Sequence, residues 1–98
     1  MRAAVLRAYN EDLSLEEVAE PLCPEDGVVL RVLACGVCRS DYHGWTGTHP
    51  KVQDGSILGH EVAGTVVEVG RDVREWSAGD RASVIPIPYC GRDRCDFH

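Results

Sequence analysis

The hydrophobic positions of this chain fall into short apolar runs that are separated by turn-forming residues. Runs rich in Val, Leu and Ala that are bounded by Gly, Pro, Asn or Asp are typical of half-buried strands. The clearest of them is EVAGTVVEV, which ends at a glycine. The pattern predicts five strands, at Arg2–Tyr9, Leu13–Ala19, Gly27–Cys35, Glu61–Val69 and Arg81–Ile87.

One segment departs from this strand pattern. The residues CRSDYHGW show no strand alternation, and they predict one or two helical turns closed by Gly44 or Gly47. Pro86 and Pro88 place the end of the last strand at a sheet edge, because proline cannot donate to a sheet. Many short strands with almost no long amphipathic helix indicate a mainly β domain, a barrel or a sandwich.

Length and charge restrict the class of protein. The 98 residues suffice for one small domain. A net charge of -6 with scattered arginines argues against nucleic acid or an anionic membrane as the main partner. We find no export signal and no apolar run near the ~20 residues of a membrane span. We therefore expect a cytoplasmic protein with a small-molecule partner.

The cysteines add a chemical question. Five is an odd number, so they cannot all pair within the chain, and without an export signal we expect reduced thiols. Cys35 and Cys38 have the C-x-x-C spacing of thioredoxin-like redox motifs, but that motif belongs to a βαβ context that this chain lacks. Because Cys35 ends an alternating strand, we interpret it as a buried, unreactive thiol. Only Cys38 is then placed for chemistry.

A histidine lies just before the clearest strand. His60 and Glu61 precede the run of valines, so that their side chains are held on a rigid element. A thiolate and an imidazole presented by neighbouring strands are a plausible beginning of a tetrahedral zinc site. Taken alone, Cys38 and His60 are explained equally well by a buried thiol and an incidental histidine.

Longer motifs carry more information than this spacing. CGVCRSDYHGWTG and GHEVAGTVVEVG, followed by WSAGDR, resemble the N-terminal catalytic domain of zinc-dependent medium-chain alcohol dehydrogenases. The resemblance runs from about Met1 to Ile87. It implies a GroES-like, partly open β-barrel with one short helix near CRSDYH, and it implies reversible oxidation of an alcohol to an aldehyde or ketone. The implied cofactors are zinc and NAD or NADP.

The resemblance also implies a ligand set, which is taken over from the family, since Cys₂His is known for the catalytic zinc of alcohol dehydrogenases. Cys38 would be a thiolate ligand and His60 the imidazole ligand. Glu61 would be a close neighbour that approaches the metal when its open position rearranges. Asp41 would accept the free ring N–H of His60, which fixes the ring's tautomer and orientation. Ser40 and Asp41 are also explained as the N-cap and the first-turn acid of the short helix, an interpretation that is compatible with these roles.

Four further roles follow from the resemblance. Ser40 would hydrogen-bond the alcohol and begin a proton relay, and His43 would finish it by way of the nicotinamide ribose. Arg39 would pair with the cofactor pyrophosphate, close to His43. Trp45 would form part of the pocket wall for the alcohol. In this scheme zinc stabilises the alkoxide and the nicotinamide takes the hydride.

The sequence departs from the family in its last ten residues. The family has a structural zinc lobe with four closely spaced cysteines, whereas YCGRDRCDFH offers only Cys90 and Cys95, and Asp93 and Asp96 stand where the family's second and third cysteines would be. A closed structural site needs four ligands. We therefore interpret residues 1–89 as the GroES-like domain and 90–98 as the remnant of a truncated lobe that does not hold structural zinc.

A second departure concerns what lies downstream of His98 in the family. The third catalytic ligand, another cysteine, and the dinucleotide-binding domain would both follow there, and no G-x-G-x-x-G follows a strand here. We expect an N-terminal fragment that binds zinc weakly and has little or no turnover alone. NAD or NADP would be held mainly by the downstream domain, and oligomers would form only from the full-length enzyme.

Two other interpretations stay open. The chain could be a stand-alone GroES-like module that binds metal or a partner without catalysis. It could also be a zinc-free enzyme of the quinone-reductase type, although such relatives generally lack the ligands that Cys38 and His60 provide.

Overall fold

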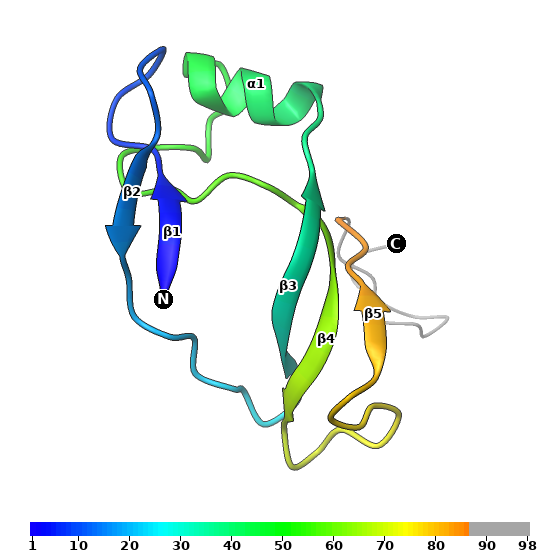
Figure 1. Ribbon diagram of the computed structural model, residues 1–98. Coiled ribbons are helices and arrows are strands. Elements are labelled where there is room, and N and C mark those ends of the chain that lie inside the picture. The colour runs from blue at the N-terminus through cyan, green and yellow to red at the C-terminus, as the bar shows by residue number, and fades with distance from the viewer. Residues whose placement is uncertain (87–98) are drawn as a thin grey trace.

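The computed structural model describes residues 1–86, in which five strands and one helix follow one another along the chain (Figure 1). The mainly β class with one short helix is therefore confirmed. The elements are β1 Arg2–Val5, β2 Ser14–Glu17, β3 Val28–Gly36, α1 Arg39–Thr46, β4 Glu61–Val69 and β5 Arg81–Ser83.

The positions of all five strands match the hydrophobic pattern, and β4 has the predicted bounds. The first strand is shorter than predicted because Leu6 leaves it to bond with a loop instead. The Leu6 N–H donates to the Ser56 carbonyl, and the Leu6 carbonyl accepts from Gly55 N–H, both at 2.8 Å. The predicted end of the last strand at Ile87 is wrong within the described residues, since β5 ends at Ser83. Ile87 itself lies outside them.

The strands form two antiparallel sheets. β1 pairs with β2 in one sheet, and the other sheet has the order β3-β4-β5. A single bridge between Val5 and Ile57 connects the end of β1 to the loop before β4. The register of β3 and β4 shifts between Val29 and Leu30 and again between Val32 and Ala34. These irregularities bend the longest strand pair of the described chain and change which side chains face inward.

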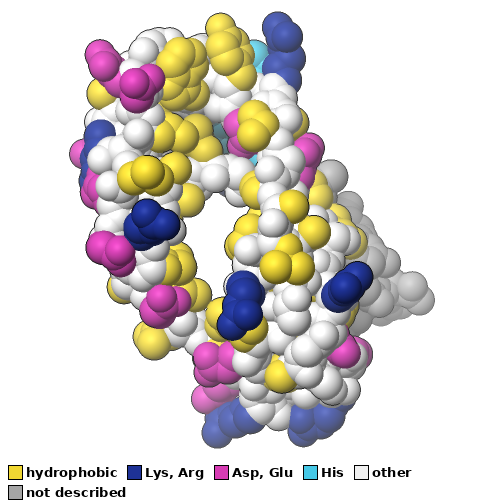
Figure 2. Space-filling view, in the orientation of Figure 1, with side chains coloured by type: hydrophobic (Ala, Val, Ile, Leu, Met, Phe, Trp, Pro, Cys, Tyr) yellow, Lys and Arg dark blue, Asp and Glu magenta, His cyan; other side chains and the backbone are white. Residues whose placement is uncertain are grey.

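The interior between the two sheets is largely open. Figure 2 shows an opening that passes between them, and a hollow of about 810 Å³ is lined by residues of both sheets. Within residues 1–86 the buried hydrophobic side chains are Val5, Leu6 and Val66. Leu22 and Val37 are 94% and 87% exposed. The described strands thus form a partly open arrangement of two sheets rather than a closed barrel.

The β3–β4 pairing brings two distant segments together. Gly36, at the end of β3, pairs with Glu61, at the start of β4. Cys38 follows β3 by two residues and is the N-cap of α1, and His60 directly precedes β4. The helix is closed by Gly47, one of the two predicted positions, which is its C-cap residue with φ 86°. Among the described residues, no helix has the length and apolar character to cross a membrane.

Candidate functional site

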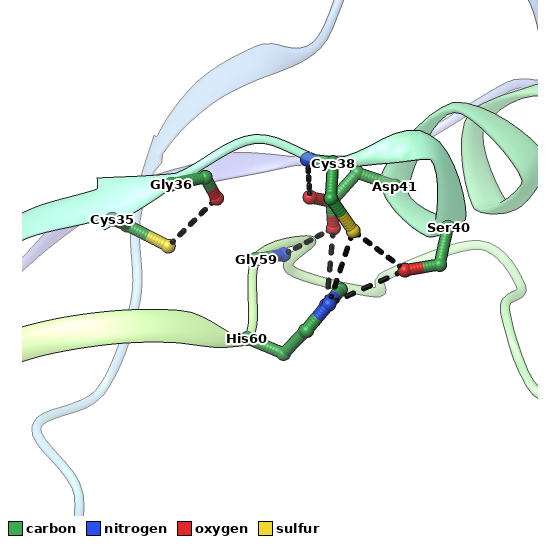
Figure 3. Close-up of polar contacts among 7 residues, drawn as sticks. All are labelled: Cys35, Gly36, Cys38, Ser40, Asp41, Gly59 and His60. Atoms are coloured by element: carbon green, nitrogen blue, oxygen red, sulfur yellow. Dashed lines mark hydrogen bonds and ion pairs between the residues drawn. The ribbon is translucent and has the colours of Figure 1, made fainter. Parts of the chain in front are cut away.

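A sulfur and an imidazole nitrogen meet where β3, α1 and β4 converge (Figure 3). The Sγ of Cys38 lies 3.2 Å from the Nε2 of His60. The Oγ of Ser40 lies 2.8 Å from the same sulfur and 3.2 Å from the same nitrogen. Three side chains that can bind a metal or move a proton therefore point toward one spot. Cys38 and Ser40 come from the start of α1, and His60 comes from the segment that leads into β4.

Asp41 connects the start of α1 with the segment that precedes β4. It is only 9% exposed, and its two carboxylate oxygens have different partners. Oδ2 accepts the Cys38 N–H at 3.0 Å, and Oδ1 accepts the Gly59 N–H at 3.1 Å. Oδ1 also lies 3.4 Å from the Nδ1 of His60. One carboxylate thus joins the start of the helix to the segment that carries the imidazole.

The local sequence explains why the helix starts here. The N-cap is Cys38, with an extended backbone, and not Ser40 as the alternative interpretation had it. Asp41 occupies the third helical position, where its carboxylate satisfies the N–H of the N-cap residue and compensates the positive end of the helix dipole. The first turn therefore presents Cys38 and Ser40 as neighbours of the same imidazole.

The donor set fits a transition metal. The ligand atoms of Cys38, Asp41 and His60 lie within 4.8 Å of one another. Thiolate sulfur and imidazole nitrogen are the ligands that zinc prefers. The carboxylate of Asp41 lies beside the Nδ1 of His60, whereas the sulfur lies beside Nε2. The geometry thus offers one sulfur and one nitrogen for a metal, with the carboxylate behind the ring.

Three further predicted site residues lie on the elements that flank this contact, two on α1 and one on β4. Glu61, the first residue of β4, is exposed, and a side chain on Gly36 would collide with its carboxylate. Arg39, the first residue of α1, is exposed. His43 is also exposed, and its ring lies edge-on to Tyr42 with 6.0 Å between the ring centres. The roles of all three stay predictions.

Trp45 lines a separate cavity. Its Nε1–H donates to the Glu11 carbonyl at 2.7 Å, which ties α1 to the loop between β1 and β2. The cavity, of about 530 Å³, is also lined by Leu13, Tyr42 and Leu58, and it reaches Asp41. Its lining includes neither sulfur nor imidazole of the candidate site. The apolar composition of this cavity was not predicted, because its walls come from four separate segments.

The prediction that Cys35 is buried is wrong. It is exposed at the end of β3, as are all residues from Arg31 to Gly36, because in the described chain no element covers either face of this half of the strand. Its Sγ lies 3.6 Å from the Gly36 carbonyl, whereas the sulfur of Cys38 contacts Ser40 and His60. The two thiols therefore have different partners. Cys90 and Cys95, with the proposed remnant 90–98, lie outside the described residues.

Comparisons with known proteins match this arrangement. The protein-family model for the alcohol dehydrogenase GroES-like domain matches residues 24–98. The chain belongs to this family. An alcohol dehydrogenase from Geobacillus stearothermophilus is 38% identical to this GroES-like domain over 98 residues, which cover 99% of this chain and 29% of that protein.

Two solved structures resemble this GroES-like domain. Zinc dependent alcohol dehydrogenase 2 from Streptococcus pneumonia, in its apo form, has a TM-score of 0.86 and 30% identity, with 99% of this chain and 27% of that chain covered. A proposed zinc-binding dehydrogenase from Sinorhizobium meliloti 1021, bound to NADP, has a TM-score of 0.72 and 35% identity, with 82% of this chain and 23% of that chain covered. The GroES-like domain thus spans less than a third of the relatives that it matches.

Proposed function

We propose that this domain supplies the first metal ligands and the proton relay of a zinc-dependent alcohol dehydrogenase that uses NAD or NADP. The observation that carries the proposal is the contact between the Cys38 sulfur and the His60 Nε2, 3.2 Å apart, in a domain of this family. The names of its relatives support an alcohol or aldehyde as the substrate. The NADP in one similar structure supports the nicotinamide cofactor. The dinucleotide would be held mainly by a domain other than this one.

In this proposal Cys38 and His60 hold the zinc ion, and Glu61 stands beside the site. When bound, zinc supplies Lewis-acid polarisation of the alcohol or carbonyl oxygen. Asp41 keeps the His60 ring oriented through Nδ1, so that Nε2 stays directed at the sulfur. Because a thiolate ligand must stay reduced, we also place the protein in the cytoplasm.

Oxidation of the alcohol removes a proton from oxygen and a hydride from carbon. The Ser40 hydroxyl accepts the alcohol proton and passes its own proton on, so its charge does not change. His43 would release the proton to solvent, beside the ribose of the nicotinamide cofactor it would help to hold, since an imidazole gains and loses protons near neutral pH. Ser40 and His43 are three residues apart on α1, which places them on one helix face. Arg39 and His43 would hold the nicotinamide cofactor, which would supply the hydride acceptor when bound, and Trp45 would contribute to the alcohol pocket.

Metal binding tests the proposal on the 98-residue chain. We expect it to bind Zn²⁺ and Co²⁺, and we expect His60→Ala to weaken binding by about tenfold or more because a ligand is lost. The control is His49→Ala, which changes a histidine of an exposed loop. Equal affinities of the two variants would contradict the assignment of His60.

Activity provides the second test. The 98-residue chain alone is expected to show no steady alcohol-dependent reduction of NAD or NADP, measured by absorbance of the reduced cofactor. Any longer product of the same reading frame that adds a dinucleotide-binding domain is expected to show it, and Ser40→Ala is expected to lower its kcat by about a hundredfold. An unchanged kcat in that variant would remove Ser40 from the relay.

A further inference from the structure

A tight contact holds the imidazole segment against the end of β3. Gly59, the residue before His60, has φ +112°, and its N–H donates to Asp41 Oδ1 at 3.1 Å. A Cβ atom at position 59 would lie 2.8 Å from the Sγ of Cys35, closer than real Cβ atoms approach other atoms. The Cα of Gly59 therefore faces the Cys35 side chain with no room for a side chain of its own. Figure 3 shows both residues beside the Cys38–His60 contact, with the Gly59 N–H directed at Asp41.

This contact lies next to the proposed ligands. Cys35 pairs with Val62 in the β3–β4 register, so its sulfur stands over the segment that leads into β4. Moving Gly59 away from Cys35 would move the attached His60 and would lengthen the 3.1 Å bond to Asp41. The side chain at position 35 thus limits how closely the imidazole segment approaches the start of α1.

We propose that Cys35 and Gly59 form a positioning pair, in which the size of the thiol and the missing side chain of Gly59 together place the His60 ring beside the sulfur of Cys38. This inference rests on the proposed metal site. It gives Cys35 a role that depends on its volume, whereas a metal ligand or a redox partner would depend on its sulfur. The Sγ of Cys35 contacts the Gly36 carbonyl at 3.6 Å, whereas the sulfur beside the His60 ring is that of Cys38.

The test uses the 98-residue chain with two measurements. Co²⁺ titration, followed by the absorption of the thiolate–cobalt bond, reports the affinity and geometry of the site. Hydrogen exchange of the Gly59 amide, followed by NMR in the metal-free chain, reports the contact with Asp41 without any metal. Cys35→Ser removes the thiol and nearly keeps the volume of the side chain. Cys35→Leu also removes the thiol but makes the side chain much larger.

We expect Cys35→Ser to bind Co²⁺ with an affinity within about twofold of the unaltered chain, and Cys35→Leu to bind about tenfold more weakly, in the range seen when groups behind metal ligands are changed. The Gly59 amide should exchange at an unchanged rate in Cys35→Ser and faster in Cys35→Leu. Gly59→Ala should resemble Cys35→Leu. Adding Cys35→Ala to Gly59→Ala should recover about threefold in affinity, since the two changes are coupled through one contact.

Three results would overturn the positioning pair. One is a loss of Co²⁺ binding in Cys35→Ser as severe as in Cys38→Ser, which would make Cys35 a ligand. Another is unchanged amide exchange in both Cys35→Leu and Gly59→Ala. The last is a double variant no better than Gly59→Ala. If the unaltered chain binds no metal, the proposed function fails, and the exchange rates of Gly59 still decide the positioning role.

Discussion

The carboxylate of Asp41 offers the sharpest test of how the site is built. Replacing it with asparagine keeps its shape but leaves one acceptor oxygen where the carboxylate has two. In the structure the two oxygens serve different donors, the N–H of Cys38 and the N–H of Gly59. Asp41→Asn must therefore direct an amide NH₂ group at one of these donors, in a position that is only 9% exposed.

The magnitude follows from the bonds that are lost. A hydrogen bond to a charged group contributes about 1.5–3 kcal/mol to stability, and an unpaired buried donor costs a similar amount. Asp41→Asn abolishes one such bond and weakens the other, so we expect a loss of about 3 kcal/mol in the free energy of unfolding. A domain of this size has about 5–15 kcal/mol in total. The open interior places this chain at the lower end of that range.

Urea unfolding measured by circular dichroism tests this estimate. With a slope of about 1 kcal/mol per molar urea, the expected loss lowers the midpoint by about 3 M. The matched control is Asp54→Asn, which makes the same chemical change in a carboxylate that is 71% exposed and accepts one hydrogen bond from Arg7. We expect no measurable change there, because exposed ion pairs contribute little.

The comparison between the two variants shows whether Asp41 holds the start of α1 against the segment before β4. Equal midpoints for Asp41→Asn and Asp54→Asn would show that Asp41 does not hold the two segments together. In that case the β3–β4 pairing alone would position His60. A lower midpoint for Asp41→Asn should be accompanied by weaker Co²⁺ binding by about tenfold, since the same carboxylate faces the His60 ring.

Two further predictions concern the sheets. The Arg7 guanidinium, mainly through its hydrogen bonds, lowers the pKa of Glu16 from 4.5 to about 2. Because the folded pKa is the lower one, the stabilisation is present above pH 4.5 and is lost as the pH falls toward 2. Urea midpoints of the unaltered chain and Glu16→Gln should therefore differ at pH 6 and converge near pH 2, and a constant difference would contradict this. Gly64→Ala should lower stability by about 2 kcal/mol or more, since its Cβ would collide with the Arg31 carbonyl oxygen in the backbone of β3; an unchanged melting temperature would refute the close approach.

Much of the local structure could be predicted from short-range patterns. The bounds of β4 were predicted because a segment rich in valine ends at a glycine. The helix was predicted because CRSDYHGW lacks alternation, and the glycine after it closes the last turn. The exposure of Cys35 was not predictable, since alternation along one strand does not show whether another element covers its faces, and residues 31–36 of β3 are all exposed. The same holds for the contact of Asp41 with the Gly59 amide.

The sequence by itself determined which chemical groups are present and which elements carry them, because alternation, turn residues and the thiol and imidazole motifs act over a few neighbouring positions. Only the tertiary structure decided that the sulfur of Cys38 and the ring of His60 meet at 3.2 Å. The physical reason is the antiparallel register of β3 and β4, which pairs Gly36 with Glu61 and closes a long loop between them. No local pattern encodes that pairing, since it depends on how two distant strands bury their faces together.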